Sequence, residues 1–234
     1  MFPYDPQLLT LAESSPQSVA EVVKTLEGID AICVDQDGLK WFNWLYMRIT
    51  EAVGARVAAS DGLKDSAWLA TLDVQFAGFY FEALRSWLAQ ESASRNCWGV
   101  LFERRNDTRL TRLQFALAGV NAHINHDLCA AIVATCELTG TTPRHGGPQH
   151  ADYTAVNSTL DSQIDAAERE LNVSLLGDRR PLMRPIEFKV AASREKAWLN
   201  AEGLWHLRAT PELAANYLDA IDRLTIAAGR ALLI

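Results

Sequence analysis

The distribution of proline is the feature that most constrains how this chain can fold. Its eight prolines stand at positions 3, 6, 16, 143, 148, 181, 185 and 211, so none occurs between residues 17 and 142. Because proline breaks a helix interior and is tolerated in first turns and connections, this span has room for several long helices. Strand-like alternation of apolar and polar residues is nearly absent. We therefore predict an all-α fold.

The helical pattern extends over the whole chain without a repeat or a convincing domain boundary. We predict a single domain over residues 1–234, a bundle of about seven or eight helices, with residues 1–13 loosely ordered. The longest pattern, at about residues 109–138, is apolar on two opposite sides at about 100° per residue. A helix of that kind is usually buried, and we predict that the others surround it.

This central helix carries polar side chains that need partners. The stretch from Gly119 to Leu128 reads GVNAHINHDL and includes His123 and Asp127. Burying such groups unpaired costs about 1–3 kcal/mol each, and more for a lone charge. Their partners are therefore each other, a metal ion or a bound molecule.

The spacing of His123 and Asp127, four residues apart, brings both side chains to one face of the helix. His150 and Asp152 follow at the start of a later helix, and we expect them to approach the same point. These four are the candidate catalytic residues. The candidate substrate-binding residues are Asn121, Asn125, Tyr153 and Asn157. For Asn121 and Asn125, the alternative is interhelical amide hydrogen bonding.

Three interpretations of this polar cluster are open. A divalent metal ion, Zn or Fe/Mn, held by His123, Asp127 and His150 would activate water or polarise a carbonyl or phosphoryl group. Alternatively, a metal-free enzyme would use His123, held by Asp127, as general acid or base. Both predict a small-molecule substrate and chemistry of the hydrolase or lyase/cyclase type. In the third interpretation the cluster only braces the core of a binding or structural protein.

Composition excludes several classes of function. The net charge of −7 and the pI of about 5.3, without a basic run, exclude nucleic acid as a predicted partner. No apolar run is long enough to span a membrane, and the first residues lack the pattern of a signal peptide. The four cysteines form no CxxC pair, which is typical of a reduced cytoplasmic protein.

The stretch from Ile32 to Gly38, ICVDQDG, resembles the start of a haloacid-dehalogenase-type phosphatase, in which an apolar strand precedes DxDG. That fold needs alternating strands and helices, and the rest of the chain offers almost no strands. A helix N-cap at Asp37 accounts for the same residues.

A broader resemblance covers about residues 37–205. Its motifs are Asp37-Gly38-Leu39 followed by WFN and LY, the His-Ile-Asn-x-Asp-Leu box, HxDYxxVN from His150, and Arg194 with Trp198. Together they resemble a bacterial and fungal family of all-helical proteins, a domain of unknown function. The resemblance implies one site formed by His123, Asn125, Asp127, His150, Asp152 and Asn157. Zinc-dependent phospholipase C is similar only in its HxxxD spacing, since its second HxxxE helix is not evident here.

Overall fold

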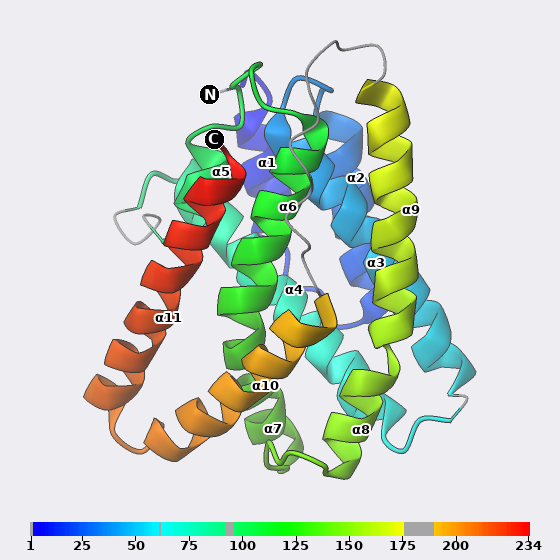
Figure 1. Ribbon diagram of the computed structural model, residues 1–234, viewed down its shortest axis with the longest axis vertical. Coiled ribbons are helices and arrows are strands. Elements are labelled where there is room, and N and C mark those ends of the chain that lie inside the picture. The colour runs from blue at the N-terminus through cyan, green and yellow to red at the C-terminus, as the bar shows by residue number, and fades with distance from the viewer. Residues whose placement is uncertain (1, 61, 92–95, 176–189) are drawn as a thin grey trace.

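The computed structural model describes residues 2–60, 62–91, 96–175 and 190–234, and within them every regular element is a helix. This arrangement confirms the predicted all-α single domain (Figure 1). The elements are α1 (Asp5–Ala12), α2 (Val19–Ile32), α3 (Gly38–Ala59), α4 (Ser66–Leu88), α5 (Gly99–Phe102), α6 (Arg112–Ala122), the π-helix η2 (His123–Asp127), α7 (Leu128–Thr139), α8 (Pro148–Ala155), α9 (Asn157–Leu175), α10 (Val190–Leu207) and α11 (Pro211–Leu232).

Side chains at the helix starts account for several of these boundaries. Asp37 caps α3 by accepting the backbone N–H of Leu39, which confirms the cap and leaves no strand for a phosphatase motif. Thr111 caps the central helix in a reciprocal capping box with Gln114. At its other end, Gly140 adopts the left-handed conformation that commonly ends a helix.

The predicted central helix is confirmed, and it consists of α6, η2 and α7 in direct succession. Helices α3, α4, α10 and α11 all pack against it, so it lies at the middle of the bundle (Figure 1). Two boundaries differ from expectation. The segment that we expected to be loosely ordered contains α1, which is held because the side chain of Leu8 is fully buried. The later helix that was predicted to start near His150 is divided at Val156 into α8 and α9.

A reciprocal pair of glycines brings α3 and α6 unusually close. A Cβ atom on Gly38 would lie 2.4 Å from the ring of Phe115, and one on Gly119 would lie 2.3 Å from the ring of Phe42. On each helix the glycine and the phenylalanine are four residues apart and therefore lie on the same face. The phenyl ring of each helix thus packs against the glycine backbone of the other. This packing fixes the axial register of α3 against α6, one turn before the polar box.

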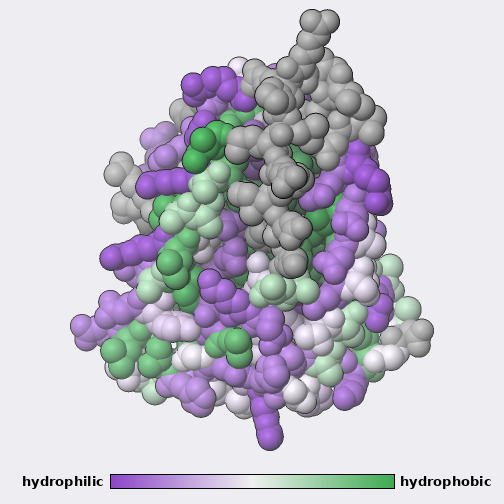
Figure 2. Space-filling model, in the orientation of Figure 1, coloured by the Kyte–Doolittle hydropathy of each residue, from purple (hydrophilic) through white to green (hydrophobic). Residues whose placement is uncertain are grey.

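The surface carries most of the polar residues, as the sequence pattern predicts. Figure 2 shows hydrophilic residues over much of one face, with apolar residues gathered in shorter patches. Among the described residues, no helix combines the length and the apolar character that crossing a membrane requires.

Candidate functional site

The central helix widens into a π-helix over the five residues of the polar box. The backbone N–H of Leu128 donates to the carbonyl of His123, five residues earlier, instead of four as in an α-helix. Single π-turns of this kind are rare and often occur at functional sites. Here the turn lets His123 and His126 approach Asp127 from two sides.

Asp127 is the hub of the site, because its carboxylate accepts three hydrogen bonds. His123 Nδ1 lies 3.0 Å from Oδ2, and the indole Nε1 of Trp98 lies 2.9 Å from the same oxygen. His126 Nδ1 lies 2.8 Å from Oδ1. An ionised carboxylate only accepts hydrogen bonds, so both imidazoles must carry a proton on Nδ1. In their neutral forms, both therefore present a bare lone pair on Nε2.

Burial and these hydrogen bonds act in opposite directions on the three titratable groups. Burial alone would raise the pKa of Asp127, but the hydrogen bonds from both histidines lower it below its usual range. Burial lowers the pKa of His123 despite its bond to Asp127. For His126, burial lowers the pKa, but the hydrogen bond to Asp127 and the charges of Asp127 and Asp222 outweigh that effect and raise it. At neutral pH we therefore expect a neutral His123 beside an ionised Asp127.

Aromatic rings surround the imidazole of His123. The ring of Phe76 on α4 stacks on it with centroids 3.5 Å apart, and the ring of Tyr46 on α3 lies edge-on at 4.6 Å. Tyr46 stands one turn after Phe42, so the glycine-phenyl register of α3 and α6 brings it to His123. The Nε2 atom of His123 is buried and has no hydrogen-bond partner among the described residues.

Oδ2 of Asp73 is another buried polar atom without a hydrogen-bond partner among the described residues. The charge of Asp73 acts on Tyr46, whose hydroxyl pairs with that of Thr50. Thr50 follows Tyr46 by one turn of α3, and Asp73 precedes the stacked Phe76 by one turn of α4. Burial raises the pKa of Asp73 to about 7, although the charge of Arg194 partly opposes it. Unpaired buried polar atoms are uncommon, so His123 Nε2 and Asp73 Oδ2 are the candidate atoms for contact with a ligand.

Arg194 is the buried cation whose charge lowers the pKa of Asp73, against the effect of burial. Its guanidinium donates to Asn157 Oδ1 at 2.8 Å and to the carbonyl of Tyr153 at 2.7 Å, and it lies over the ring of Tyr153. Within the described residues it forms no ion pair. Two predicted substrate-binding residues, Tyr153 and Asn157, therefore hold Arg194 in place. The hydroxyl of Tyr153 also donates to the carbonyl of Arg194 at 2.8 Å.

The structure does not bring His150 and Asp152 to the histidine pair, contrary to our expectation. His150 Nε2 contacts Glu195 at 3.1 Å, and its ring lies against His145. Both oxygens of Asp152 accept the backbone N–H of Lys64 at 2.9 Å, just before α4. The physical reason is that the start of α8 packs on the start of α4, where unpaired backbone N–H groups attract a carboxylate.

Asn121 forms the interhelical amide hydrogen bond that was the alternative to ligand contact, whereas Asn125 bonds within its own helix. Asn121 Nδ2 donates to the carbonyl of Thr225 on α11 at 3.0 Å. Asn125 Nδ2 in turn donates to Asn121 Oδ1 at 3.0 Å. Asn121 thus links the central helix to α11, whereas the bond of Asn125 to Asn121 stays within the central helix.

Sequence reasoning missed three side chains that contact or face the histidines, namely Tyr46, Trp98 and Asp222. It also missed Asp73, whose charge acts on Tyr46. Asp73 carried a usable signal, since it is the only acid in the largely apolar run from Trp68 to Phe81. Trp98 and Asp222 carried none, because both meet the box only through tertiary packing.

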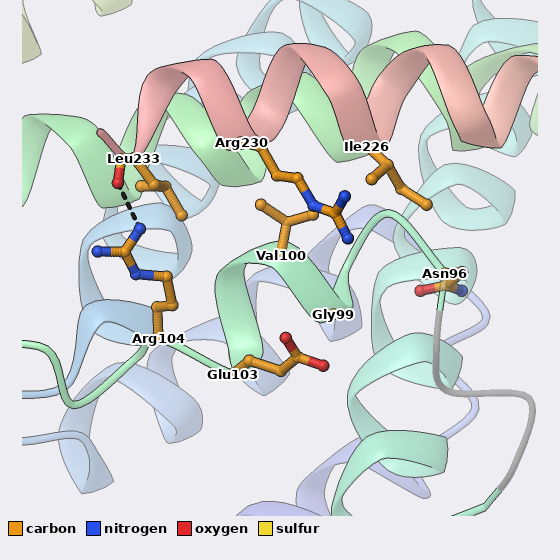
Figure 3. A pocket seen from close by; sticks show the side chains of 8 residues that line it. All are labelled: Asn96, Gly99, Val100, Glu103, Arg104, Ile226, Arg230 and Leu233. Atoms are coloured by element: carbon orange, nitrogen blue, oxygen red, sulfur yellow. Dashed lines mark hydrogen bonds between the residues drawn. The ribbon is translucent and has the colours of Figure 1, made fainter.

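The described residues contain two groups of His, Cys, Asp or Glu side chains that could hold a metal ion. One consists of Cys97, His126 and Asp222, and the other of His145, His150 and Glu195. Neither includes His123 or Asp127. A surface hollow of about 480 Å³ lies between α5 and α11, with Arg230 and Ile226 on one side and Glu103 on the other (Figure 3).

Comparison with protein families shows to which family the chain belongs. Residues 19–234 match the model of a family of unknown function, DUF5995, and the chain belongs to that family. This confirms the resemblance inferred from the sequence motifs. No curated protein and no solved structure matches the chain significantly.

Proposed function

We propose that this member of DUF5995 is a small-molecule enzyme in which His123, oriented by Asp127, acts as a general base. The observation that carries the proposal is the state of the imidazole. Its Nδ1 is bonded to a carboxylate, while its Nε2 is buried without a partner in the described part of the chain. A carboxylate that fixes the tautomer of a histidine and leaves the other nitrogen free is the usual arrangement of a catalytic base.

The protonation state of His123 fits this role. Burial lowers its pKa, so the imidazole is neutral at pH 7 and its Nε2 lone pair is available to take a proton. The imidazolium that then forms would be stabilised by the adjacent carboxylate of Asp127, 3.0 Å from Nδ1.

Asp73 is the matching acid in this proposal. Burial raises its pKa to about 7, so a large fraction of its carboxyl group is protonated at neutral pH. A base with a lowered pKa and an acid with a raised pKa in one region are the combination that proton-transfer enzymes use. The hydroxyl of Tyr46, whose pKa burial raises well above 10, would serve as a neutral hydrogen-bond donor.

The walls of the region favour an apolar substrate. Phe76, Tyr46, Phe42, Tyr80 and Trp98 all contact the imidazole of His123 through their rings. We therefore propose chemistry of the hydrolase or lyase/cyclase type on a largely apolar small molecule that carries one or two polar groups.

The acid–base form of the enzyme is better supported than the form with Zn or Fe/Mn at His123, Asp127 and His150. Asp127 already accepts three hydrogen bonds, and His150 bonds to Glu195 instead. A cation at Asp127 would have to compete with N–H donors that already point at its oxygens.

The test is a turnover screen with a matched control. Wild type, His123→Gln and the control His145→Gln, which removes an exposed imidazole, would each be incubated with a small-molecule extract and a panel of esters, lactones and amides. Mass spectrometry should find a compound consumed by wild type and the control, and consumed about 10²–10⁴-fold more slowly by His123→Gln.

The structural interpretation of the same residues makes a different prediction. If His123 only braces the core, His123→Gln would lose thermal stability, and any activity found would persist in its folded fraction. Asp73→Asn supplies a second readout. It should remove the limb of the pH-rate profile near pH 7 if Asp73 is the acid.

A further inference from the structure

His126 lies on the other side of Asp127 from His123 and faces a second group of side chains. Its Nε2 atom is 3.8 Å from Oδ1 of Asp222 on α11. The sulfur of Cys97, just before α5, completes the group, and the three ligand atoms lie within 4.8 Å of one another. The group thus joins α5, η2 and α11. Cys97 is buried, whereas His126 and Asp222 retain 19% and 17% side-chain exposure.

The tautomer of His126 makes this group suited to a cation. Asp127 Oδ1 accepts the proton of Nδ1, so neutral His126 directs the Nε2 lone pair toward the carboxylate of Asp222. Two lone-pair atoms facing each other repel unless a proton or a metal ion lies between them. A histidine that binds a metal through one nitrogen normally donates its other N–H to a carboxylate, as His126 does.

From this geometry we propose that Cys97 Sγ, His126 Nε2 and a carboxylate oxygen of Asp222 form a binding site for a divalent ion of the zinc class. A thiolate, an imidazole and a carboxylate are the ligand types that Zn²⁺ takes in four-coordinate sites, with water as the fourth ligand. Ligand atoms around tetrahedral zinc are about 3.4 Å apart for nitrogen and oxygen, so the 3.8 Å gap closes with a small side-chain rotation.

A backbone hydrogen bond holds the carboxylate of Asp222 in position to act as a metal ligand. Its Oδ1 accepts the N–H of Cys97 at 2.7 Å, which fixes the acid beside the thiol. Asn96, the residue before Cys97, and Ile226, one turn after Asp222, both line the hollow between α5 and α11 (Figure 3). The hollow therefore lies beside the chain segments that carry Cys97 and Asp222.

The second group with metal-type spacing lacks the required tautomer. His150 Nδ1 accepts the backbone N–H of Gly146 at 3.3 Å, so the proton of neutral His150 is on Nε2. That proton points to Glu195, 3.1 Å away, and no lone pair is free on Nε2 for a metal. His145, which completes the group, is mostly exposed. This contrast supplies a control within the same chain.

The experiment uses Co²⁺ as a spectroscopic probe for the zinc-class ion. Chelator-treated full-length protein would be titrated with CoCl₂, and the near-ultraviolet thiolate-to-cobalt band and the visible d–d bands would be recorded. We expect one Co²⁺ per chain with both bands in wild type and in the controls His145→Gln and Cys136→Ser. We expect the thiolate band to be lost in Cys97→Ser, and stoichiometric binding to be lost in Asp222→Asn.

Asp127→Asn keeps all three proposed ligands and changes the residue that orients His126, which also accepts hydrogen bonds from His123 and Trp98. Removing such an outer contact typically weakens metal affinity about 10–100-fold, which competition with a chelator measures. Circular dichroism of each variant separates loss of binding from loss of fold. The proposal is independent of the role of His123, because metal binding is measured without a substrate.

Two results would overturn the proposal. One is the absence of a thiolate-to-cobalt band in folded wild-type protein. The other is equal Co²⁺ affinity in wild type, Cys97→Ser and Asp222→Asn, which would assign the binding to other residues. In either case the contact between His126 and Asp222 would be an ion pair of a protonated imidazole, and a pH titration of the His126 ring by NMR would identify it.

Discussion

Asp127 serves as acceptor for three buried N–H donors, and its replacement should therefore be costly. Asp127→Ala leaves Trp98 Nε1 and the Nδ1 atoms of His123 and His126 without an acceptor. Each unsatisfied buried group costs about 1–3 kcal/mol, although either imidazole can shed part of that cost by changing tautomer. We expect the free energy of unfolding in urea to fall by about 3–5 kcal/mol.

The control for this prediction is Asn125→Ala. Asn125 belongs to the same π-helix, but its side chain donates a hydrogen bond only to Asn121 among the described residues, and it is half-buried. Its loss should cost about 1 kcal/mol. Equal losses in the two variants would mean that the carboxylate does not hold the indole and imidazole donors.

Asp73 should make the stability of the fold depend on pH. Burial raises its pKa from 3.8 to about 7, so the folded state binds a proton more tightly than the unfolded state. Stability from this group is therefore fully present below about pH 4, falls as the pH rises through the window from about 4 to 7, and is lowest above it. Asp73→Asn lacks the carboxyl group and should escape this loss.

The measurement is urea denaturation of wild type and Asp73→Asn at pH 4 and pH 8. At about 1.36 kcal/mol per pH unit, the shift from 3.8 to about 7 corresponds to at most about 4 kcal/mol. The variant should gain stability relative to wild type by up to that amount between the two pH values. A difference independent of pH would show that Asp73 is ionised in the folded protein at neutral pH.

At the scale of single residues, the sequence predicts what local spacing determines. His123 and Asp127 form a hydrogen bond because four residues of helix bring them to one face. The cap at Asp37 is local in the same sense. Tyr46, Asp73 and Trp98 could not be predicted as neighbours of the box, because they arrive on other helices whose packing no short motif specifies.

At the scale of elements, the contact between α3 and α6 depends on two glycines, and this can be tested. In Gly119→Ala the new Cβ would lie 2.3 Å from the ring of Phe42 and 2.6 Å from its Cβ, so the ring cannot simply swing aside. Overpacking of this kind costs about 1–3 kcal/mol, and occasionally more. We expect a loss at or above the upper end of that range, because the register of the whole helix pair must shift.

Gly78 on α4 is the matched control for this substitution. It is exposed, and nothing lies within 4 Å of the position that its Cβ would occupy. Alanine is about 0.5–1 kcal/mol better than glycine inside a helix, so Gly78→Ala should stabilise the protein by about that amount. A neutral Gly119→Ala would contradict the close approach of α3 and α6.

At the scale of elements, the sequence predicted neither the π-helix nor the packing of the start of α8. A regular helix predicts that His126 is 60° from His123, whereas the π-turn brings both imidazoles onto Asp127. The expected convergence of His150 with His123 was based on side-chain chemistry, because the chain has only five histidines and few could serve as partners. The N-terminus of α4 attracts Asp152 instead, an electrostatic preference that becomes visible only once the two helix ends are known to meet.

At the scale of the whole molecule, the all-α class followed from the proline-free span and from helical periodicity. The burial of the central helix followed from its two apolar sides. The order in which the other helices surround it could not be derived, because several amphipathic faces of similar size can cover one core helix. The structure resolves this with α3, α4, α10 and α11 against the central helix.

This arrangement predicts an unequal distribution of local stability, which native-state hydrogen exchange measures. The amides of residues 116–136 are covered by four helices and should exchange only when the whole domain unfolds, with the free energy found by urea denaturation. Helix α11 lies at the edge of the bundle and leaves Leu213 and Leu224 at least half exposed, so many of its amides should exchange through smaller local openings (Figure 1). Gly119→Ala should lower protection of residues 116–136 by its global loss of stability, while the fastest α11 amides stay unchanged. If α11 were as protected as residues 116–136 and lost protection in step with them, the bundle would unfold as one cooperative unit and α11 would belong to its core.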